Sequence, residues 1–455
     1  MITSSKENGQ SAGPDVNSTK GADFMTPQIA TVLIIIVLMS ISFFTEILPL
    51  GFTALMVPVL LQGTGILNAS QAWSGFGNAT VITWIGMFII GNVFARTSFT
   101  YRIKSFVKNH AGGSQVRVIV MILMACTVMG LMTSAAATLA ALTPIINEIC
   151  DDNGIDRKRV FKSVADVSTW ACVQMLPIGS SLSYFILFNE YLETAGTDLR
   201  YGLLDMTWIK LPMWIVLVVY YIIASRKMSA VSSGVTTSST AANVPEKKTS
   251  YTPKQEKMAV FIFVANTILM VIASFTKIVP VYLVSTTFAS LAVGLRLVTE
   301  KEALSSVSWN VIFLVAGSLP LSTAINISGT GEWVSNIIQT SFPGLTNPVV
   351  LATAFCVISM ICTQFMNNTA VWAVFAPIAA VMAINLNMDP RLVVAGVACG
   401  ALICFATPMA AVADAYSYGI CNFNMKEFVK LGWFPCVLMT IAFVIWAPIV
   451  LNLIY

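Results

Sequence analysis

Long apolar runs separated by short polar stretches constrain the fold of this chain more than any other feature. An ordinary soluble domain is about a quarter charged residues, whereas this chain is 10% charged and 56% hydrophobic. A soluble core formed by 455 residues cannot bury so much apolar surface, but a bilayer can, since about 20 apolar helical residues cross its core. The sequence predicts an all-α polytopic membrane protein. Uninterrupted spans are predicted over residues 28–47, 50–66, 80–97, 205–225, 258–276, 280–297, 308–325 and 430–453.

Four further apolar stretches contain Ser, Thr, Asn, Gly or Pro near their centres. In hydrocarbon, non-helical backbone survives only where it packs inside protein or lines a cavity. The ends of half-helices there present dipoles and free backbone groups to ions. We therefore expect these four stretches to hold the binding site of a secondary transporter. Residues 118–149 could form one tilted helix or two short arms folded into a hairpin, and 347–386 are their counterpart; residues 162–192 and 391–422 are each predicted to form a broken helix.

Shared Pro and Gly positions indicate an internal repeat, because these residues set backbone shape. Polar composition predicts a disordered tail over 1–27 and a linker over 226–257, and the matching positions predict a first repeat over 28–225 and a second over 258–455. At an offset of 231 residues, Phe44-Thr45 matches Phe275-Thr276, Pro49 matches Pro280, Ala72 matches Ala303, Gly86 matches Gly317 and Pro177 matches Pro408; at 233, Pro144 matches Pro377.

The distribution of Lys and Arg predicts the orientation. With five crossings in each half, the second repeat enters the membrane inverted relative to the first. If the linker is cytoplasmic, 19 of the 25 basic residues face the cytoplasm, Lys162 among them, and six face outward, Lys210 among them. The positive-inside rule therefore predicts a cytoplasmic linker and outward-facing termini in a multi-pass protein of the plasma membrane.

The hairpin centres carry side chains suited to anions or cations. The first contains Ser134 and Thr138, and the second contains Thr363 followed by Asn367-Asn368-Thr369. Amide and hydroxyl donors can bind a carboxylate, and Asn oxygens with backbone carbonyls can instead hold sodium. The same residue types also join helices without any transport role. Adjacent amides are costly at mid-membrane, which favours a functional second tip, whereas the two interpretations stay open for the first.

Pro177 and Pro408 begin the two helix breaks. Each proline removes a donor and kinks the chain, and small residues after it leave backbone carbonyls free for an ion. These are Gly179 and Ser180 in the first break and Ala410 in the second.

Asp414 is the one acid in an otherwise uncharged stretch. An intramembrane carboxylate is a functional candidate by default. It could bind a cation, carry a proton, or cap the short helix that follows. Asp166 lies nearer the basic cytoplasmic end, and we expect it to pair with a charge there.

At these residues the sequence resembles the divalent anion:sodium symporter family of the wider ion-transporter superfamily, whose members carry dicarboxylates, citrate or sulfate. The resemblance covers most of residues 28–455. Residues 43–49 resemble the family's Trp-Trp-x-Thr-Glu-x-x-Pro motif, and Trp309 to Gly317 with Ser328-Gly329 resembles the start of its second half. The hairpin tips lie where the family has Ser-Asn-Thr, and the breaks where it has a Pro-x-x-Thr-Pro-Pro-Asn type turn.

The resemblance implies a scaffold domain and an elevator-type transport domain, in which hairpin tips meet broken helices, and a homodimer. It implies an anionic or zwitterionic solute as ligand, sodium or a proton as coupling ion, no other cofactor, and contact with lipid but not nucleic acid. The implied substrate residues are Ser134, Thr138, Asn367, Asn368, Thr369, Pro408 and Asp414, and the implied ion residues are Ser134, Gly179, Ser180, Thr363, Asn368, Ala410 and Asp414.

The first tip departs from the family pattern, because Ala135 and Ala136 replace its Asn and Thr. Asn367 replaces Ser in the second tip, and Ser183 and Asp414 each replace an Asn in the breaks. These departures leave open cation-coupled uptake of di- or monocarboxylates and exchange or sodium/proton antiport. A non-transporting membrane protein is the weaker alternative. With a single His and no C-x-x-C pair, we expect neither an enzyme nor a metal site.

Overall fold

The computed structural model describes residues 25–45, 47–99, 102, 115–153, 155–178, 181–225, 251–276, 278–341, 343–409 and 411–454. Every regular element in these ranges is helical, which confirms the predicted all-α class. The predicted tail lies almost wholly outside the described residues, as do most of the linker and the candidate ion residues Gly179, Ser180 and Ala410.

The helices fall into a similar order before and after the linker. A helix ends within each of the four predicted interruptions. The first half contains α1 (Pro27–Thr45), α2 (Leu50–Gly63), α3 (Ala69–Ala72), η2 (Ser74–Gly77), α4 (Ala79–Ala95), α6 (Gln115–Met132), α7 (Ala135–Asn153), α8 (Arg157–Ala171), α9 (Ser181–Thr194) and α10 (Asp205–Ser225). The second contains α11 (Pro253–Thr276), α12 (Val281–Gly294), α13 (Glu300–Ser306), α14 (Trp309–Ser318), α15 (Pro320–Ile327), α16 (Thr330–Ser341), η3 (Pro343–Thr346), α17 (Pro348–Thr363), α18 (Asn368–Asn385), α19 (Pro390–Leu402), α20 (Val412–Ile420) and α21 (Met425–Ile454).

Several of these helices are long and apolar enough to cross a bilayer. Among the described residues they are Asp205–Ser225, Pro253–Ala273, Trp309–Ile327, Asn368–Asn385 and Met425–Val450. The spans predicted over 50–66 and 280–297 were too long, because α2 and α12 hold 14 residues each. At 1.5 Å per residue each is about 21 Å long. The apolar residues that follow them form turns, so hydropathy alone overstated both helices.

Reciprocal glycine contacts join the two halves, where α4 packs on α12 and α14 packs on α2. A Cβ added to Gly317 would lie 2.2 Å from the backbone oxygen of Ala54, and one added to Gly86 would lie 2.8 Å from that of Ser285. Only glycine allows the backbones to approach so closely. Gly86 and Gly317, like Ala54 and Ser285, are 231 residues apart. Residues separated by this offset therefore make equivalent contacts.

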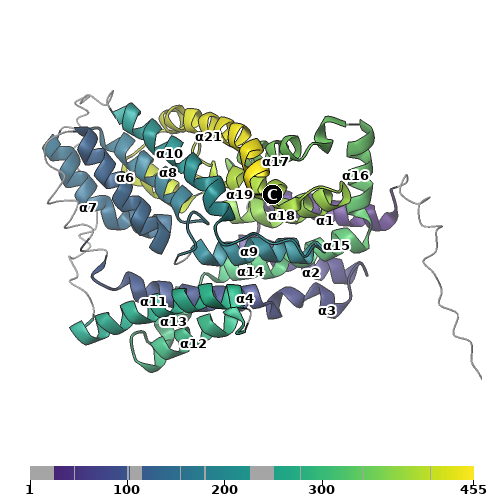
Figure 1. Cartoon of the computed structure of the whole chain (residues 1–455), viewed down its shortest axis with the longest axis horizontal. Coiled ribbons are helices and arrows are strands. Elements are labelled where there is room, and N and C mark those ends of the chain that lie inside the picture. Colours follow the sequence, from purple (N-terminus) through teal and green to yellow (C-terminus); the bar gives the residue numbers. More distant parts are fainter. Residues whose placement is uncertain are drawn as a thin grey trace, which may run out of the picture.

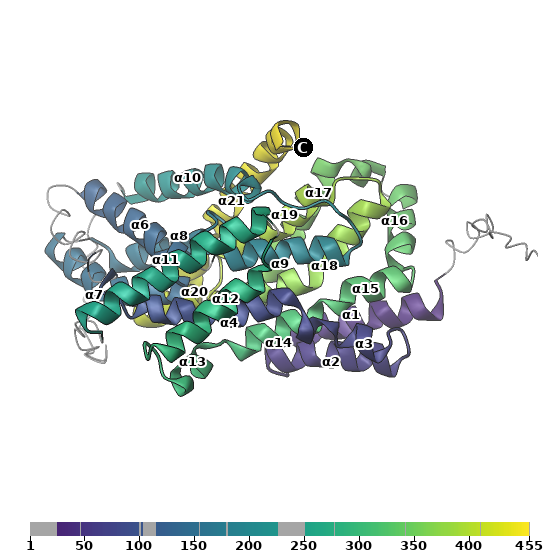
Figure 2. The ribbon, with the colours of Figure 1, turned by 60° about the horizontal axis from the view of Figure 1, so that its bottom comes forward.

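The molecule is elongated. Helices α6 and α7 of the first hairpin lie at one end, α16 lies at the other, and α17 and α18 of the second hairpin lie between the middle and α16, in both views (Figures 1 and 2). Helices α4, α11, α12 and α13 lie together along one side (Figure 2). A large apolar core runs through the broken helices and the hairpins. This core surrounds the polar groups described next.

Candidate functional site

The second hairpin tip is fastened to the second helix break by polar side chains. Thr363 Oγ1 donates to the carbonyl of Ala401 at 2.8 Å. Gln364 Nε2 donates to the carbonyl of Ile403 at 2.8 Å, and Gln364 Oε1 accepts from the backbone N–H of Ala406 at 3.1 Å. These backbone groups lie at the end of α19, where helical hydrogen bonding stops. The tip therefore supplies the partners that the break requires inside the membrane.

Asn367, Asn368 and Thr369 divide their roles within this tip. Asn367 caps α18, and its Oδ1 accepts from the backbone N–H of Thr369 at 2.9 Å. Asn368 is buried, and its Oδ1 accepts from Thr363 Oγ1 at 2.9 Å. Asn367 and Thr369 are half-buried. They lie at the positive end of an 18-residue helix, where backbone N–H groups favour anions.

The first tip offers far less polar chemistry. Ser134 is exposed, and its Oγ accepts from the backbone N–H of Ala137 at 3.3 Å. Thr138 is fully buried and bonds to Thr133 at 3.0 Å within the same hairpin. No amide side chain stands at this tip, because Ala135 occupies the position that matches Asn368 at the 233 offset. The described part of the structure thus brings Ser134 and Thr138 to the tip without a carboxylate clamp.

A fully buried charge cluster joins the two broken helices. Lys162 of α8 forms ion pairs with Asp166, one turn further along, and with Asp414 of α20, whose Oδ1 lies 2.9 Å from the Lys162 Nζ. Tyr221 of α10 donates its hydroxyl to Asp166. The three charged side chains are at most 1% exposed. The expected pairing of Asp166 with a nearby charge is confirmed.

The enclosure of Lys162 was not expected from its place in a basic segment. Its two carboxylate partners and the rings of Phe405 and Phe428, centred 5.8 and 4.4 Å from its Nζ, enclose it, so its side chain does not reach solvent. Among the described residues, the Asp414 carboxylate bonds to Lys162 and Cys404 and not to the backbone of α20, so the capping interpretation fails.

The cluster continues into the second hairpin tip. Asn368 Nδ2 lies 3.8 Å from the sulfur of Cys404, and that sulfur lies 4.0 Å from Asp414 Oδ2. Predicted ion residues Thr363, Asn368 and Asp414 are therefore brought together. One lysine and two aspartates carry a formal charge of −1, which is costly to bury without a compensating cation or proton. This arrangement is chemically suited to holding one such ion. Pro408 is half-buried in the adjacent break.

The first break contains polar groups that sequence reasoning missed. Lys210 is 0% exposed and donates to the backbone of the break, so protein encloses its side chain. Gln174 has a φ of 51° and donates from Nε2 to the carbonyl of Tyr184 at 2.9 Å. Within the described ranges, Gln174 Oε1 and Trp372 Nε1 are buried without a hydrogen-bond partner. Hydropathy along the sequence does not reveal buried polar atoms that lack a hydrogen-bond partner.

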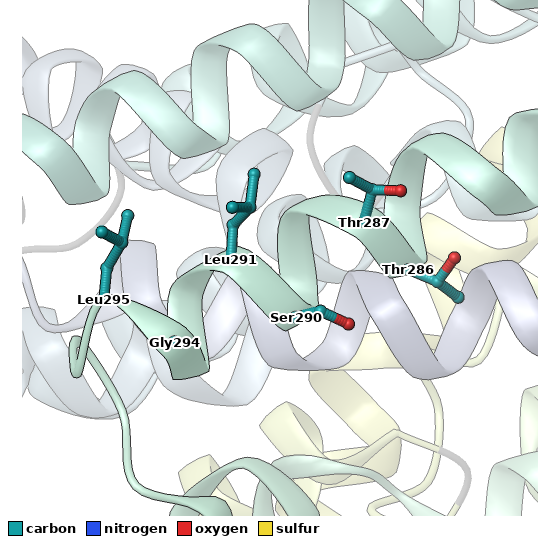
Figure 3. A pocket seen from close by; sticks show the side chains of 6 residues that line it. All are labelled: Thr286, Thr287, Ser290, Leu291, Gly294 and Leu295. Carbon is teal, nitrogen blue, oxygen red and sulfur yellow. The ribbon is translucent and has the colours of Figure 1, made fainter.

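A surface hollow of about 450 Å³ lies elsewhere, along α12 (Figure 3). It includes no charged side chain and none of the predicted site residues, so it is poorly suited to a carboxylate. Its lining consists of Thr286, Thr287, Ser290, Leu291, Gly294 and Leu295.

Comparison with known proteins links this geometry to transporters. The sequence profile of the citrate transporter family matches residues 31–400. The chain is similar to the sodium-dependent dicarboxylate transporter SdcS of Staphylococcus saprophyticus, with 22% identity over 88% of this chain and 82% of that protein. Similarity to SdcS of Staphylococcus aureus strain USA300 is 21% over 90% of this chain and 84% of that protein.

A solved structure shares the fold. The YdaH transporter of Alcanivorax borkumensis, whose crystal structure is described as having an unusual topology, superposes with a TM-score of 0.62. The match covers 94% of this chain and 99% of that one at 11% sequence identity.

Proposed function

This chain belongs to the citrate transporter family, and from that premise we propose that it takes up small carboxylates, dicarboxylates foremost, by coupling them to a cation. It is a permease of the divalent anion:sodium symporter type, a multi-pass protein of the plasma membrane and not an enzyme. The sodium-dependent dicarboxylate transporters among its relatives support both the anionic substrate and the cation coupling.

The observation that carries the proposal is the connection of the second hairpin tip to the buried charge cluster that Asp414 shares with Lys162 and Asp166. Asn367 and Thr369 lie at the amino end of α18, which favours a substrate carboxylate. The tip connects through Asn368 and Cys404 to Asp414. A cation that neutralises this cluster removes a charge that would otherwise repel the incoming anion, so cation and substrate binding are coupled.

The domain arrangement follows as part of the proposal. Residues 28–225 and 258–455 form two inverted repeats, with the linker in the cytoplasm. The hairpins and broken helices form the moving transport domain, and α1, α2, α4, α11, α12 and α14 form a scaffold that pairs with that of a second copy. The equivalent glycine contacts of α4 and α14 support the repeat.

The test is uptake of radiolabelled succinate and citrate into proteoliposomes under a sodium gradient, a proton gradient or neither. We expect one of the two gradients to stimulate uptake. We expect Asn367→Ala and Thr369→Val to abolish it, while Thr286→Val, a matched loss of a hydroxyl in the α12 hollow, leaves it unchanged. Absence of uptake of either acid under both gradients would remove the proposal.

Exchange of one carboxylate for another is the second candidate function. The first tip favours it, because alanines there replace polar residues that could bind a coupling ion. Counterflow distinguishes the two functions. An exchanger accumulates labelled substrate only when unlabelled carboxylate is loaded inside the liposome, whatever the cation gradient.

A further inference from the structure

Lys210 is a buried cation without a buried acid. Its side chain, on α10, is 0% exposed, and among the residues that the structure describes no carboxylate forms an ion pair with it. Its ammonium donates to the backbone carbonyls of Trp170, at 3.1 Å, and Val173. It also lies 4.7 Å from the centre of the Trp170 ring. An isolated buried charge is very costly, so the two carbonyls and the indole ring must replace the hydration that the Lys210 ammonium loses on burial.

The place where Lys210 binds explains how a charge is tolerated. Trp170 is the penultimate residue of α8, and Val173 lies just beyond it. The free carbonyls at a helix C-terminus carry partial negative charge, and the indole face attracts a cation as well. The Trp170 Nε1 donates in return to the Lys210 carbonyl at 3.3 Å. The contact is therefore two-sided and holds the ammonium at one position.

The matching place in the second half is occupied by a neutral group. At the offset of 231 that pairs Pro177 with Pro408, Trp170 corresponds to Ala401, whose carbonyl accepts from the Thr363 hydroxyl at 2.8 Å. At the offset of 233 that relates the hairpins, Thr363 and Gln364 correspond to Gly130 and Leu131, which have no side-chain donor. The first hairpin thus has no side-chain donor at these positions, and an ammonium from α10 takes the place of a hydroxyl from the hairpin.

Carbonyls at the ends of half-helices coordinate the coupling ion in secondary transporters. We propose that Lys210 is a tethered cation that permanently fills such a position at the end of α8, so that the first half binds no free coupling ion there. This inference rests on the proposed function as a cation-coupled carrier. It also accounts for the loss of polar residues at the first tip, because a half that recruits no ion at this place has no use for the amide and hydroxyl ligands that Ala135 and Ala136 replace.

The inference requires that removing the ammonium create a vacant cation position. We expect Lys210→Ala and Lys210→Gln to leave the carbonyls of Trp170 and Val173 open to a sodium ion from solution. Lys210→Arg is the matched control, because it keeps a positive charge on a side chain of similar reach. Lys210→Gln keeps a polar side chain that can donate to one of the two carbonyls while the other stays open, so we expect it to fold even if the alanine variant does not.

The experiment is a thermal-shift titration of the purified full-length protein with sodium chloride, at ionic strength held constant with N-methyl-D-glucamine chloride and without substrate. Binding to the native state raises the melting temperature. We expect sodium to stabilise Lys210→Gln and Lys210→Ala more than the wild type or Lys210→Arg, and to steepen the sodium dependence of their uptake. Equal sodium responses in all four proteins would overturn the proposal and leave Lys210 with a structural role only. Failure of wild-type uptake would remove the proposed function while the sodium titration still decides this inference.

Discussion

Replacing Lys162 by Met tests the central cluster most severely. The substitution removes the ammonium that lies 2.9 Å from the Asp414 carboxylate. It leaves Asp166 and Asp414 in a site where the charged side chains are at most 1% exposed. Removing one partner of a buried ion pair costs about 3–5 kcal/mol. Because two like charges lose the same partner here, we expect a loss at the upper end, about 5 kcal/mol, a large part of the roughly 5–15 kcal/mol that stabilises a typical protein. Asp414→Asn leaves the Lys162–Asp166 pair intact, so we expect it to cost only about 1–3 kcal/mol.

The measurement is reversible unfolding in mixed micelles titrated with dodecyl sulfate. The double variant Lys162→Met/Asp414→Asn completes a cycle that isolates the interaction of the two residues, and residues in contact usually couple by about 0.5–3 kcal/mol. We expect the double variant to be more stable than Lys162→Met alone, because neutralising Asp414 removes a buried repulsion. If Lys162→Met is no more destabilising than Asp414→Asn, or if the coupling is below about 0.5 kcal/mol, the cluster does not carry the charges assigned to it.

Three further predictions use the same preparation. Gly317→Ala should destabilise the fold by about 1–3 kcal/mol, because its Cβ would lie 2.2 Å from the Ala54 oxygen. Gly91→Ala, whose Cβ would face open space on α4, should raise the free energy of unfolding by about 0.5–1 kcal/mol. Equal effects of the two substitutions would refute the close packing at Gly317. Gln364→Leu, which copies the residue at the equivalent first-half position, should cost about 1–3 kcal/mol and abolish uptake, and normal uptake would contradict the role of the tip. Hydrogen bonds from the backbone and hydroxyl of Thr299 and from Arg96 hold the pKa of Glu302 at about 2, below its ordinary 4.5. The stability that ionised Glu302 contributes is therefore present above pH 4.5 and lost as the pH falls toward 2. If the Glu302→Gln variant has the same stability profile between about pH 5 and 3 as the wild type, Glu302 does not make this contribution.

The fold could be read from the sequence wherever its signal is local. A Pro, Ser or Asn inside an apolar run disturbs helix formation within a few residues, so the interruptions near Ser134 and Asn367 were recognisable without knowledge of any neighbour. The lengths of α2 and α12 were misjudged because apolar residues continue past the helix ends into turns, as at Gly65, which has a φ of 75°. Hydropathy reports the surroundings of a residue and not its backbone conformation.

The charged sites could not be predicted in the same way. A lysine near a polar loop is assigned to solvent unless its partners are known, and one of the two partners of Lys162 is Asp414, 252 residues away. Lys210 has backbone carbonyls as partners, which every residue possesses and which no sequence pattern marks. Asp414 was recognisable as a functional candidate because it stands alone, but its pairing was not.

The two halves satisfy the same structural requirement by different chemistry, and this difference has a functional consequence. Each half must supply a partner to the carbonyls at the end of its broken helix. The second half uses Thr363 and Gln364, neutral side chains of its own hairpin, and Asp414 lies nearby in the cluster that it shares with Lys162 and Asp166, whose formal charge is −1. The first half uses Lys210, whose positive charge is covalently attached to the chain and does not exchange with solution. If only one half exchanges an ion with solution, substrate and cation meet at a single tip, and the carrier couples them through Asn368 and Cys404 rather than through a symmetric pair of sites.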